Sequence, residues 1–474
     1  MPGRTGALAQ FSLVHHVLGD GAVDRAALDR AVAALLAVAD RARRRGRPAD
    51  AGGMLDLALQ LSYHPSVHFS ERLSPLATDP DSFLAAYEAS PFARELIASP
   101  DALVSGAAHR QPEGRARRVL ILAHDSWTFI DRVRADLASH ADVEFRSLRV
   151  GDLPAADRPS HRSIVGMRVG YSLDGRLAPV PAALVPHLEW ADAVMVEWGT
   201  YPLAWFSLLD TERFGIEVVA RLHRFEAYTP YPMLTRFARI GTMAFVSDAV
   251  RALVARQAPR LPQAGLVVVV RNVHSYEGFA PAKDEDAPWT LVQVGWAPPV
   301  KDVLFSLRVL RRLREEDDRY RLLLLGAGLP EHPAPHEASW VAAVREALQQ
   351  SPDGVEILGY RDDVPAILSR AGFLLSSSLH EGTHESVAEA GMAGCVPVVR
   401  DWPEAAPYGG AEVIYPADWV VPDVDAAAAR VLAHQDLAML TSAGARAREW
   451  VQENRDADDV RLEYLDLLGL HPRG

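Results

Sequence analysis

Residues 372–399, GFLLSSSLHEGTHESVAEAGMAGCVPVV, carry the pattern that best indicates the fold of this chain. The first seven residues form a short apolar run that is typical of a buried strand, and VPVV at the end of the segment is a second such run. Between them a helical pattern begins at about Glu385 and continues to Gly394. A strand, a turn, a helix and another strand in this order indicate a parallel sheet that helices cover on both faces.

The same alternation extends along two separate stretches of the chain. From Arg117 onward we predict strands at RRVLILAHD, DVEFRSLRV, ADAVMVEWG, IEVVARLHR, TMAFVSD and AGLVVVVRN. Residues 277–289, rich in proline and charge, are typical of a linker. After them the pattern restarts with TLVQVGW, YRLLLLGAG, GVEILGY, GFLLSSS and VPVV. The sequence therefore predicts an α/β fold with two doubly wound, Rossmann-like domains, whose ligands bind in the turns after the strands.

The residues before the first predicted strand have a different pattern. Segments such as AALDRAVAALLAVADRARRRG place apolar residues at helical spacing, which predicts an α-helical N-terminal extension. The basic run RARRRGRP is typical of a solvated helix end. The predicted domain spans are 1–112 for the helical extension, 113–283 for the N-terminal Rossmann-like domain and 284–474 for the C-terminal one.

Composition narrows the class of protein. Lys and Arg number 49 and Asp and Glu 62, a net charge of −13, which argues against a nucleic-acid partner. The single cysteine, Cys395, excludes a disulfide within the chain. The N-terminus lacks the apolar core of a signal peptide, and no apolar run approaches the ~18 residues that span a bilayer. We expect a cytoplasmic protein whose membrane contact is at most peripheral, at the inner face.

The string HEGTH, residues 380–384, matches the zinc-protease pattern H-E-x-x-H. That chemistry needs both histidines on one helical face. Here a strand precedes the string, and Gly382 disfavours a helix by about 1 kcal/mol relative to alanine. A third protein ligand is also hard to find, because Glu404 lies among prolines and glycines. We therefore predict a β-to-α turn, no bound metal and no zinc hydrolase.

Four segments, in order and spacing, resemble the retaining nucleotide-sugar glycosyltransferases of the GT-B fold, specifically family 4 (group 1 glycosyl transferases). The resemblance covers about residues 119–468. It is carried by QVGWAPPVKD, RLLLLGAG, VEILGYRDDVPAILSRAGFLLSSSLHEG and EGTHESVAEAGMAGCVPVV. It implies an acceptor-side domain at 113–283, a nucleotide-sugar domain at 284–474, and C-terminal helices that pack back towards the first domain.

The resemblance also implies roles for single residues. Lys301 would hold the donor diphosphate, Glu381 the donor-sugar hydroxyls and Glu389 the ribose, while His223 would face the donor sugar near the reaction centre. The turn at 382–386 precedes a helix, so its free N–H groups and the helix dipole suit an anion. The predicted donor-binding residues are Gly295, Trp296, Lys301, Gly326, Gly359, Tyr360, Arg361, Ser378, Gly382, Thr383, His384, Glu385, Ser386 and Glu389.

Two departures from the family pattern carry predictions of their own. Trp296 stands where the family usually has a basic residue, so we expect Arg271 or Arg361 to supply the missing positive charge on the diphosphate. The family usually has a glycine-rich turn after the first strand, but here AHDSWTFID replaces it. We therefore expect an unusual acceptor. The predicted acceptor-side residues are His124, Asp125, Ser126, Trp127, Glu197 and Arg224.

The expected activity is metal-independent, hexosyltransferase-like transfer to a hydroxyl of a saccharide, lipid-linked or natural-product acceptor. No cofactor is expected, because the protein itself supplies the positive charge. The helical extension, residues 1–110, is a candidate surface for a partner or a second copy of the chain. Two alternatives stay open: another GT-B enzyme such as a sugar-nucleotide epimerase, and a catalytically inactive sugar-nucleotide-binding or scaffold protein.

Overall fold

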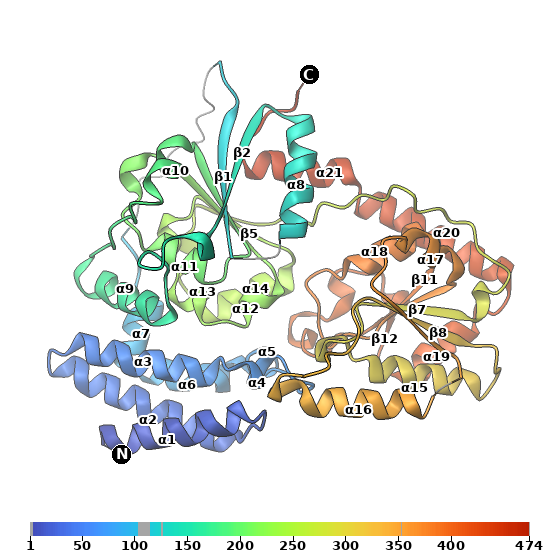
Figure 1. Ribbon diagram of the computed structural model, residues 1–474, viewed down its shortest axis with the longest axis horizontal. Helices are drawn as coiled ribbons and strands as arrows, with labels where there is room; N and C mark the ends of the chain where they lie inside the picture. The colour runs from blue at the N-terminus through green and yellow to red at the C-terminus, as the bar shows by residue number, and fades with distance from the viewer. Residues whose placement is uncertain (1–2, 103–113, 125–126, 352, 474) are drawn as a thin grey trace.

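The computed structural model describes residues 3–102, 114–124, 127–351 and 353–473. They form two α/β domains side by side, with a layer of helices beneath (Figure 1). Within these residues, no helix is long and apolar enough to cross a membrane. The predicted fold class, two Rossmann-like domains preceded by a helical region, is confirmed.

The helical extension packs against the first sheet domain rather than standing apart from it. Leu35 and Leu59, on the apolar faces of two of its helices, share one core with Val165 and Leu122 of that domain. Asp24 caps a helix start by accepting a hydrogen bond from the Ala27 amide at 3.0 Å. Its helices are α1 (Arg4–Gly19), α2 (Arg25–Arg44), α3 (Pro48–Ser62), α4 (Pro65–His68), α5 (Pro75–Thr78), α6 (Pro80–Ala89) and α7 (Pro91–Ala98).

The first sheet is parallel throughout, in the order β2-β1-β3-β4-β5-β6. Its strands are β1 (Arg117–Ala123), β2 (Val143–Arg149), β3 (Ala193–Glu197), β4 (Glu217–Leu222), β5 (Thr242–Phe245) and β6 (Leu266–Val269). Its helices are α8 (Trp127–His140), α9 (His161–Asp174), α10 (Val185–Trp190), α11 (Tyr201–Ser207), α12 (Arg224–Ala227), α13 (Tyr231–Leu234) and α14 (Asp248–Gln257). Strands β3 to β5 are buried along their whole length, as expected for a sheet covered on both faces.

The second sheet is also parallel, in the order β12-β11-β10-β7-β8-β9. Its chain order reverses between β7 and β10, the point at which doubly wound sheets bind ligands. Its strands are β7 (Thr290–Val294), β8 (Arg321–Leu325), β9 (Val355–Gly359), β10 (Phe373–Ser376), β11 (Val396–Arg400) and β12 (Val420–Val421). Its helices are α15 (Val303–Arg314), α16 (Ala338–Gln349), α17 (Val364–Arg370), α18 (Glu385–Met392), α19 (Val424–Leu432) and α20 (Leu437–Asn454).

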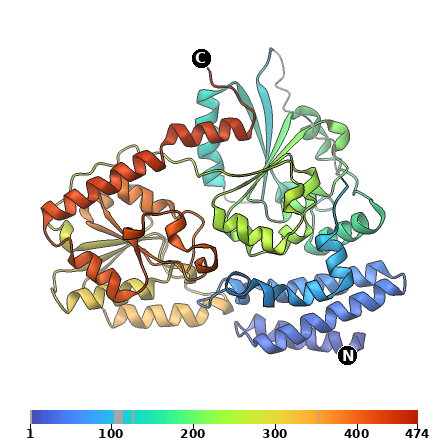
Figure 2. The same cartoon turned by 180° about the vertical axis from the view of Figure 1, so that it is seen from behind.

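The last helix, α21 (Ala457–Leu467), returns to the first domain, as Figure 2 shows from behind. Tyr464 and Leu465 on this helix belong to one apolar core with Val119 of β1. The Arg461 guanidinium pairs with Asp136 of α8 at 2.8 Å. The two sheet domains are therefore joined both at the linker and at the C-terminal end of the chain.

Candidate active site

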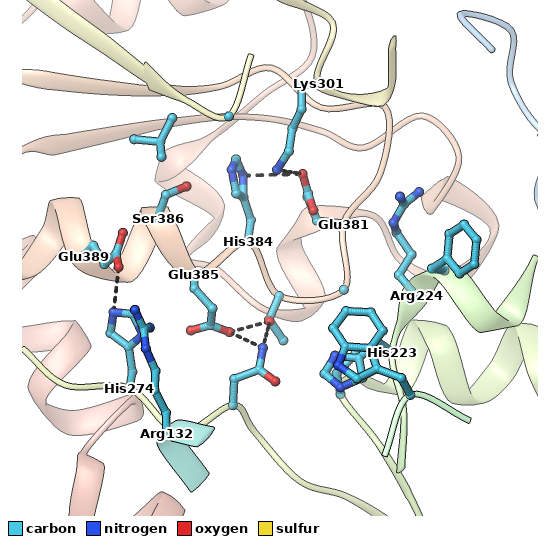
Figure 3. A pocket seen from close by; sticks show the side chains of 18 of the residues that line it. Arg132, His223, Arg224, His274, Lys301, Glu381, His384, Glu385, Ser386 and Glu389 are labelled. Carbon is cyan, nitrogen blue, oxygen red and sulfur yellow. Dashed lines mark hydrogen bonds and ion pairs between the residues drawn. The ribbon is translucent and has the colours of Figure 1, made fainter. Parts of the chain in front are cut away.

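A cleft of about 670 Å³ lies between the two sheet domains, where their strands end (Figure 3). It opens at the reversal of strand order in the second sheet, because it is bounded by the loops after β7 and β10. Its lining comprises His124, Arg132, Trp198, Thr200, His223, Arg224, Phe225, Val246, Asn272, His274, Val294, Gly295, Lys301, Glu381, Gly382, Thr383, His384, Glu385, Ser386 and Glu389.

The HEGTH string is a turn, as the sequence predicts. Strand β10 ends at Ser376 and helix α18 begins only at Glu385, with His384 in the left-handed region at φ 44°. The Tyr415 hydroxyl donates to the main-chain oxygens of Thr383 and His384 and so fixes the turn. Among the described residues, none accepts a hydrogen bond from the amides of 382–386, so these N–H groups are available to an anion in the cleft.

Lys301 and Glu381 form an ion pair at the centre of the second-domain wall. The Lys301 ammonium lies 2.6 Å from Glu381 Oε1, and the Ser378 hydroxyl donates to the same oxygen at 2.6 Å. Burial by itself raises the pKa of the Glu381 carboxyl, but the charges of Lys301 and Arg224 outweigh it and hold that pKa well below its usual range. Glu381 is therefore a carboxylate that accepts hydrogen bonds, and it is not poised to donate a proton.

His384 stays neutral beside this pair. Its Nδ1 lies 2.6 Å from the Ser376 hydroxyl, and burial together with the nearby Lys301 charge lowers its pKa to about 4. Because the His384 imidazole is uncharged, Lys301 carries the positive charge at this part of the wall. Gly295, in the left-handed region at φ 70°, lets the chain turn closely around the Lys301 side chain.

The opposite wall is built on His223, at the carboxyl end of β4. Its ring stacks on Trp198, with centroids 3.9 Å apart and planes 7° from parallel. His223 Nε2 lies 2.7 Å from Glu197 Oε1, and Arg221 pairs with the same oxygen at 2.9 Å. Burial and the Arg221 charge lower the pKa of His223 despite the opposing Glu197 carboxylate. Glu197 is thus buried behind His223 and orients it, whereas the sequence placed Glu197 on the acceptor side.

Polar groups also converge near α18. His274 Nε2 lies 3.0 Å from Glu389 Oε1, joining the loop after β6 to the middle of α18. The Asn272 amide donates to Glu385 Oε1 at 2.9 Å and to the Thr383 hydroxyl at 3.1 Å. These contacts cross from one sheet domain to the other, so the cleft is closed at this end by side chains of both.

The two histidines of HEGTH serve different contacts and do not face one metal. His380 Nε2 lies 2.9 Å from Glu404 Oε2, and its Nδ1 lies 3.0 Å from the Tyr228 hydroxyl. His384 instead contacts Ser376. In the described part of the chain, no group of three or more His, Cys, Asp or Glu residues is arranged to hold a metal ion.

Several predicted donor residues lie outside the cleft. Trp296 is buried in the core of the second domain, so it does not face the place where the usual basic residue would act. Tyr360 is 80% exposed. Gly326, Gly359 and Ser378 are likewise absent from the lining, although Ser378 supports Glu381 from behind.

The expected replacement cations are not at the cleft either. Arg361 is exposed and pairs with Asp363 at 2.6 Å. Arg271 donates to Glu463 of α21 at 2.8 Å and borders a different, smaller hollow. Neither side chain lines the cleft, so neither is in position to replace the missing charge. Arg224 lines the cleft and contacts His380 of the second domain.

On the predicted acceptor side, His124 lines the cleft and its Nδ1 lies 2.9 Å from the Tyr201 hydroxyl. Asp125 and Ser126 fall outside the described residues, as does the side chain of Trp127, whose backbone begins α8. The sequence reasoning missed Trp198, Asn272 and other lining residues. Trp198 and Asn272 lie at the carboxyl ends of two predicted strands, and this position was the signal that would have found them, since these strand ends meet at one edge of the sheet.

The two parallel sheets, with a ligand cleft at their facing carboxyl edges, define a GT-B fold. Within it, residues 288–436 match the model of the family described as glycosyl transferases group 1. No curated protein matched the sequence.

Solved structures share the fold at low identity. HepE of Anabaena, solved in complex with UDP, is 12% identical with a TM-score of 0.55, covering 74% of this chain and 99% of HepE. Sucrose-phosphate synthase from Thermosynechococcus elongatus is 15% identical with a TM-score of 0.54, covering 74% of this chain and 98% of its own. The chain spans 54% of the length of TarM, at 13% identity, 58% coverage of this chain and a TM-score of 0.46.

Proposed function

We propose that this protein is a retaining glycosyltransferase that moves a sugar from a nucleoside diphosphate sugar to an acceptor hydroxyl. The observation that carries the proposal is the Lys301–Glu381 pair beside the unpaired amides of 382–386, facing the His223–Trp198 stack across the cleft. An anion site and a carboxylate that accepts hydrogen bonds, side by side, suit a pyrophosphate joined to a sugar. The family match over residues 288–436 supports this assignment.

The leaving diphosphate gains its stabilisation from fixed groups. The amides at the N-terminus of α18 and the Lys301 ammonium place positive charge where the phosphate oxygen departs. Arg224 is the second cation in this proposal, in place of the basic residue that Trp296 replaces, because it lines the same space. Because these groups neutralise the diphosphate, no metal ion or cofactor is required for the step.

Transfer with retention follows from front-side attack. The acceptor oxygen bonds to the anomeric carbon on the face from which the diphosphate departs, the carbon–oxygen bond to phosphate breaks, and the acceptor proton passes to the departing phosphate oxygen. Glu381 orients the sugar hydroxyls, and His223 bounds the sugar from the first domain. In this proposal Glu389, which pairs with His274 at 3.0 Å, binds the ribose. Closure of the two domains excludes water from the reacting centre.

The test is a thermal-shift panel of UDP-, GDP-, ADP- and dTDP-sugars, followed by a transfer assay with the sugar that stabilises most. We expect one nucleotide class to raise Tm selectively and NMR of the product to show the anomeric configuration of the donor. Glu381→Gln is expected to keep nucleotide binding and lose transfer. Stabilisation by none of the four sugars would contradict the proposal, and inversion at the anomeric carbon would contradict the mechanism.

A further inference from the structure

A second hollow, of about 400 Å³, adjoins the cleft on the side of the helical extension. It lies between α1, α3 and the loop after α4 on one side and the first sheet domain on the other. His124, Thr200 and Phe225 border both spaces, so the hollow and the cleft meet at these three residues. Its volume falls in the range of about 300–1,000 Å³ that is usual for small-molecule sites.

Aromatic rings make up most of this hollow. On the first domain they run in sequence towards the cleft: His161 to Tyr231 at 5.6 Å between centroids, Tyr231 to Tyr201 at 6.2 Å, and Tyr201 to His124 at 4.9 Å. Rings in contact at these distances form a continuous apolar wall, and a ligand with a planar ring can pack on their edges and faces.

The helical extension supplies the facing wall. Phe69, after α4, stacks on Phe225 with centroids 4.9 Å apart and planes 22° from parallel. His15 of α1 and His64 come together at 5.7 Å. The first Rossmann-like domain alone therefore provides only half of this hollow, and α1, α3 and the α4 loop complete it.

Charge is missing from the lining. Among the described residues that border the hollow, none is Asp, Glu, Lys or Arg. Burial and the neighbouring His15 lower the pKa of His64, burial lowers that of His161, and burial raises the pKa of Tyr231 to about 12, so these groups are neutral near pH 7. A phosphate or carboxylate placed here would lose its hydration without gaining a counter-ion, which is costly.

We infer that the helical extension and the first domain together form the acceptor site, and that it takes the uncharged, ring-bearing apolar part of the acceptor. The acceptor hydroxyl then lies at the border formed by His124, Thr200 and Phe225 and faces the donor cleft. That the bound molecule is an acceptor rests on the proposed function, whereas the preference of the hollow for an uncharged, apolar ring does not depend on it. Free sugars, which need many polar partners, fit this lining poorly.

The test measures binding separately from transfer. With the nucleotide that most stabilises the chain present in excess, Kd is measured by fluorescence for 2-naphthol, its charged match 2-naphthyl phosphate, and methyl β-glucoside. We expect 2-naphthol to bind at least about tenfold more tightly than either of the others. Equal binding of the phosphate ester or the glucoside would overturn the inference, because each contradicts an uncharged apolar site.

Two pairs of variants locate the binding. Phe69→Ala removes a ring from the hollow, and Leu73→Ala truncates an exposed side chain of the same loop outside it. His15→Glu brings a carboxylate to the hollow, whereas His16→Glu places it on the neighbouring exposed position of α1. Phe69→Ala and His15→Glu are each expected to weaken 2-naphthol binding about fivefold or more. Leu73→Ala and His16→Glu are each expected to change it less than about twofold.

Failure of the proposed function would be recognised separately. If no sugar nucleotide binds, the donor assignment falls, yet 2-naphthol binding with the same variant pattern would still support the site. If nucleotide-dependent transfer occurs but Phe69→Ala and His15→Glu leave 2-naphthol binding unchanged, the inference is wrong and the glycosyltransferase assignment stands. Unchanged thermal stabilisation by the nucleotide shows in each variant that the donor cleft has stayed intact.

Discussion

The Tyr228 hydroxyl of the first domain lies 3.0 Å from His380 Nδ1 of the second, directly beside the candidate reaction centre. His380 in turn lies 2.9 Å from Glu404, whose other oxygen accepts a hydrogen bond from the Ser74 amide of the helical extension. Three parts of the chain thus meet at one buried network. In the described structure the two domains are therefore closed against each other beside the cleft.

Closure leaves little room at Gly382. A methyl group there would lie 3.0 Å from Val246 Cγ2 of the first domain, so Gly382→Ala is expected to hold the domains slightly apart. A misplacement of about 1 Å costs up to about 10²-fold in rate, and kcat should fall more than nucleotide affinity. Gly328→Ala, at a position with open space, is the matched control. Unaltered kcat, with an unaltered radius of gyration in solution scattering, would contradict the closed arrangement as the reactive one.

Lys301 supplies the charge at the departing phosphate. Lys301→Met removes it and leaves Glu381 without the partner at 2.6 Å, so kcat should fall by about 10²–10³-fold, the usual cost of losing one such group. Lys301→Arg should restore part of the rate because the charge is kept. Steady-state transfer assays check both, and Arg319→Met, far from the cleft and paired with Asp317, serves as the control. A loss confined to donor KM would mean that Lys301 binds the ground state only.

Arg224, rather than Arg271 or Arg361, is expected to be the second cation at the donor. Arg224→Ala should raise donor KM about tenfold, which corresponds to ~1.4 kcal/mol. Arg361→Ala is expected to leave donor KM unchanged, because its guanidinium pairs with Asp363 at 2.6 Å outside the cleft. Isothermal titration with the nucleoside diphosphate gives the same comparison without turnover. The opposite ranking of the two variants would return the diphosphate role to Arg361.

Glu226 makes the stability of the fold depend on pH. This carboxyl is fully buried behind His223, whose amide donates to it at 3.2 Å, and burial raises its pKa to about 8. The unfolded chain releases the proton near pH 4.5 while the folded chain keeps it, so stability falls as pH rises from about 4.5 to about 8, by at most ~1.4 kcal/mol per pH unit.

Glu226→Gln replaces the protonated carboxyl with an amide that does not ionise in this pH range, so it should remove the fall in folding stability with rising pH. Denaturant unfolding between pH 5 and pH 8 should show the variant gaining on the wild type as pH rises, with the difference largest at pH 8. Glu277→Gln, at an exposed position of the linker, should keep the wild-type slope. Parallel pH profiles for the wild type and Glu226→Gln would show that Glu226 ionises normally in the folded protein.

Local pattern was enough to place the backbone of the site. The short apolar runs at 117–123 and 373–376 marked strands, and Gly382 with the late helix start at Glu385 marked a turn where the H-E-x-x-H string suggested a metal helix. Such patterns depend only on residues that are close in sequence, so they can be recognised without knowledge of the rest of the fold. The parallel orientation of the strands followed from the same alternation, whereas their order in each sheet was known only from the structure.

Local sequence patterns were enough to predict two doubly wound sheets after a helical region, and a turn with free amides before α18. The side chains that share the cleft became known only from the folded molecule. Folding buries Trp296, turns Arg271 towards Glu463, stacks Trp198 on His223 and brings Phe69 of the extension to the rim. These contacts could not be predicted because they join segments that lie tens to hundreds of residues apart in the sequence. Spacing along one element fixes which face a side chain occupies, but the docking of whole domains fixes what that face meets.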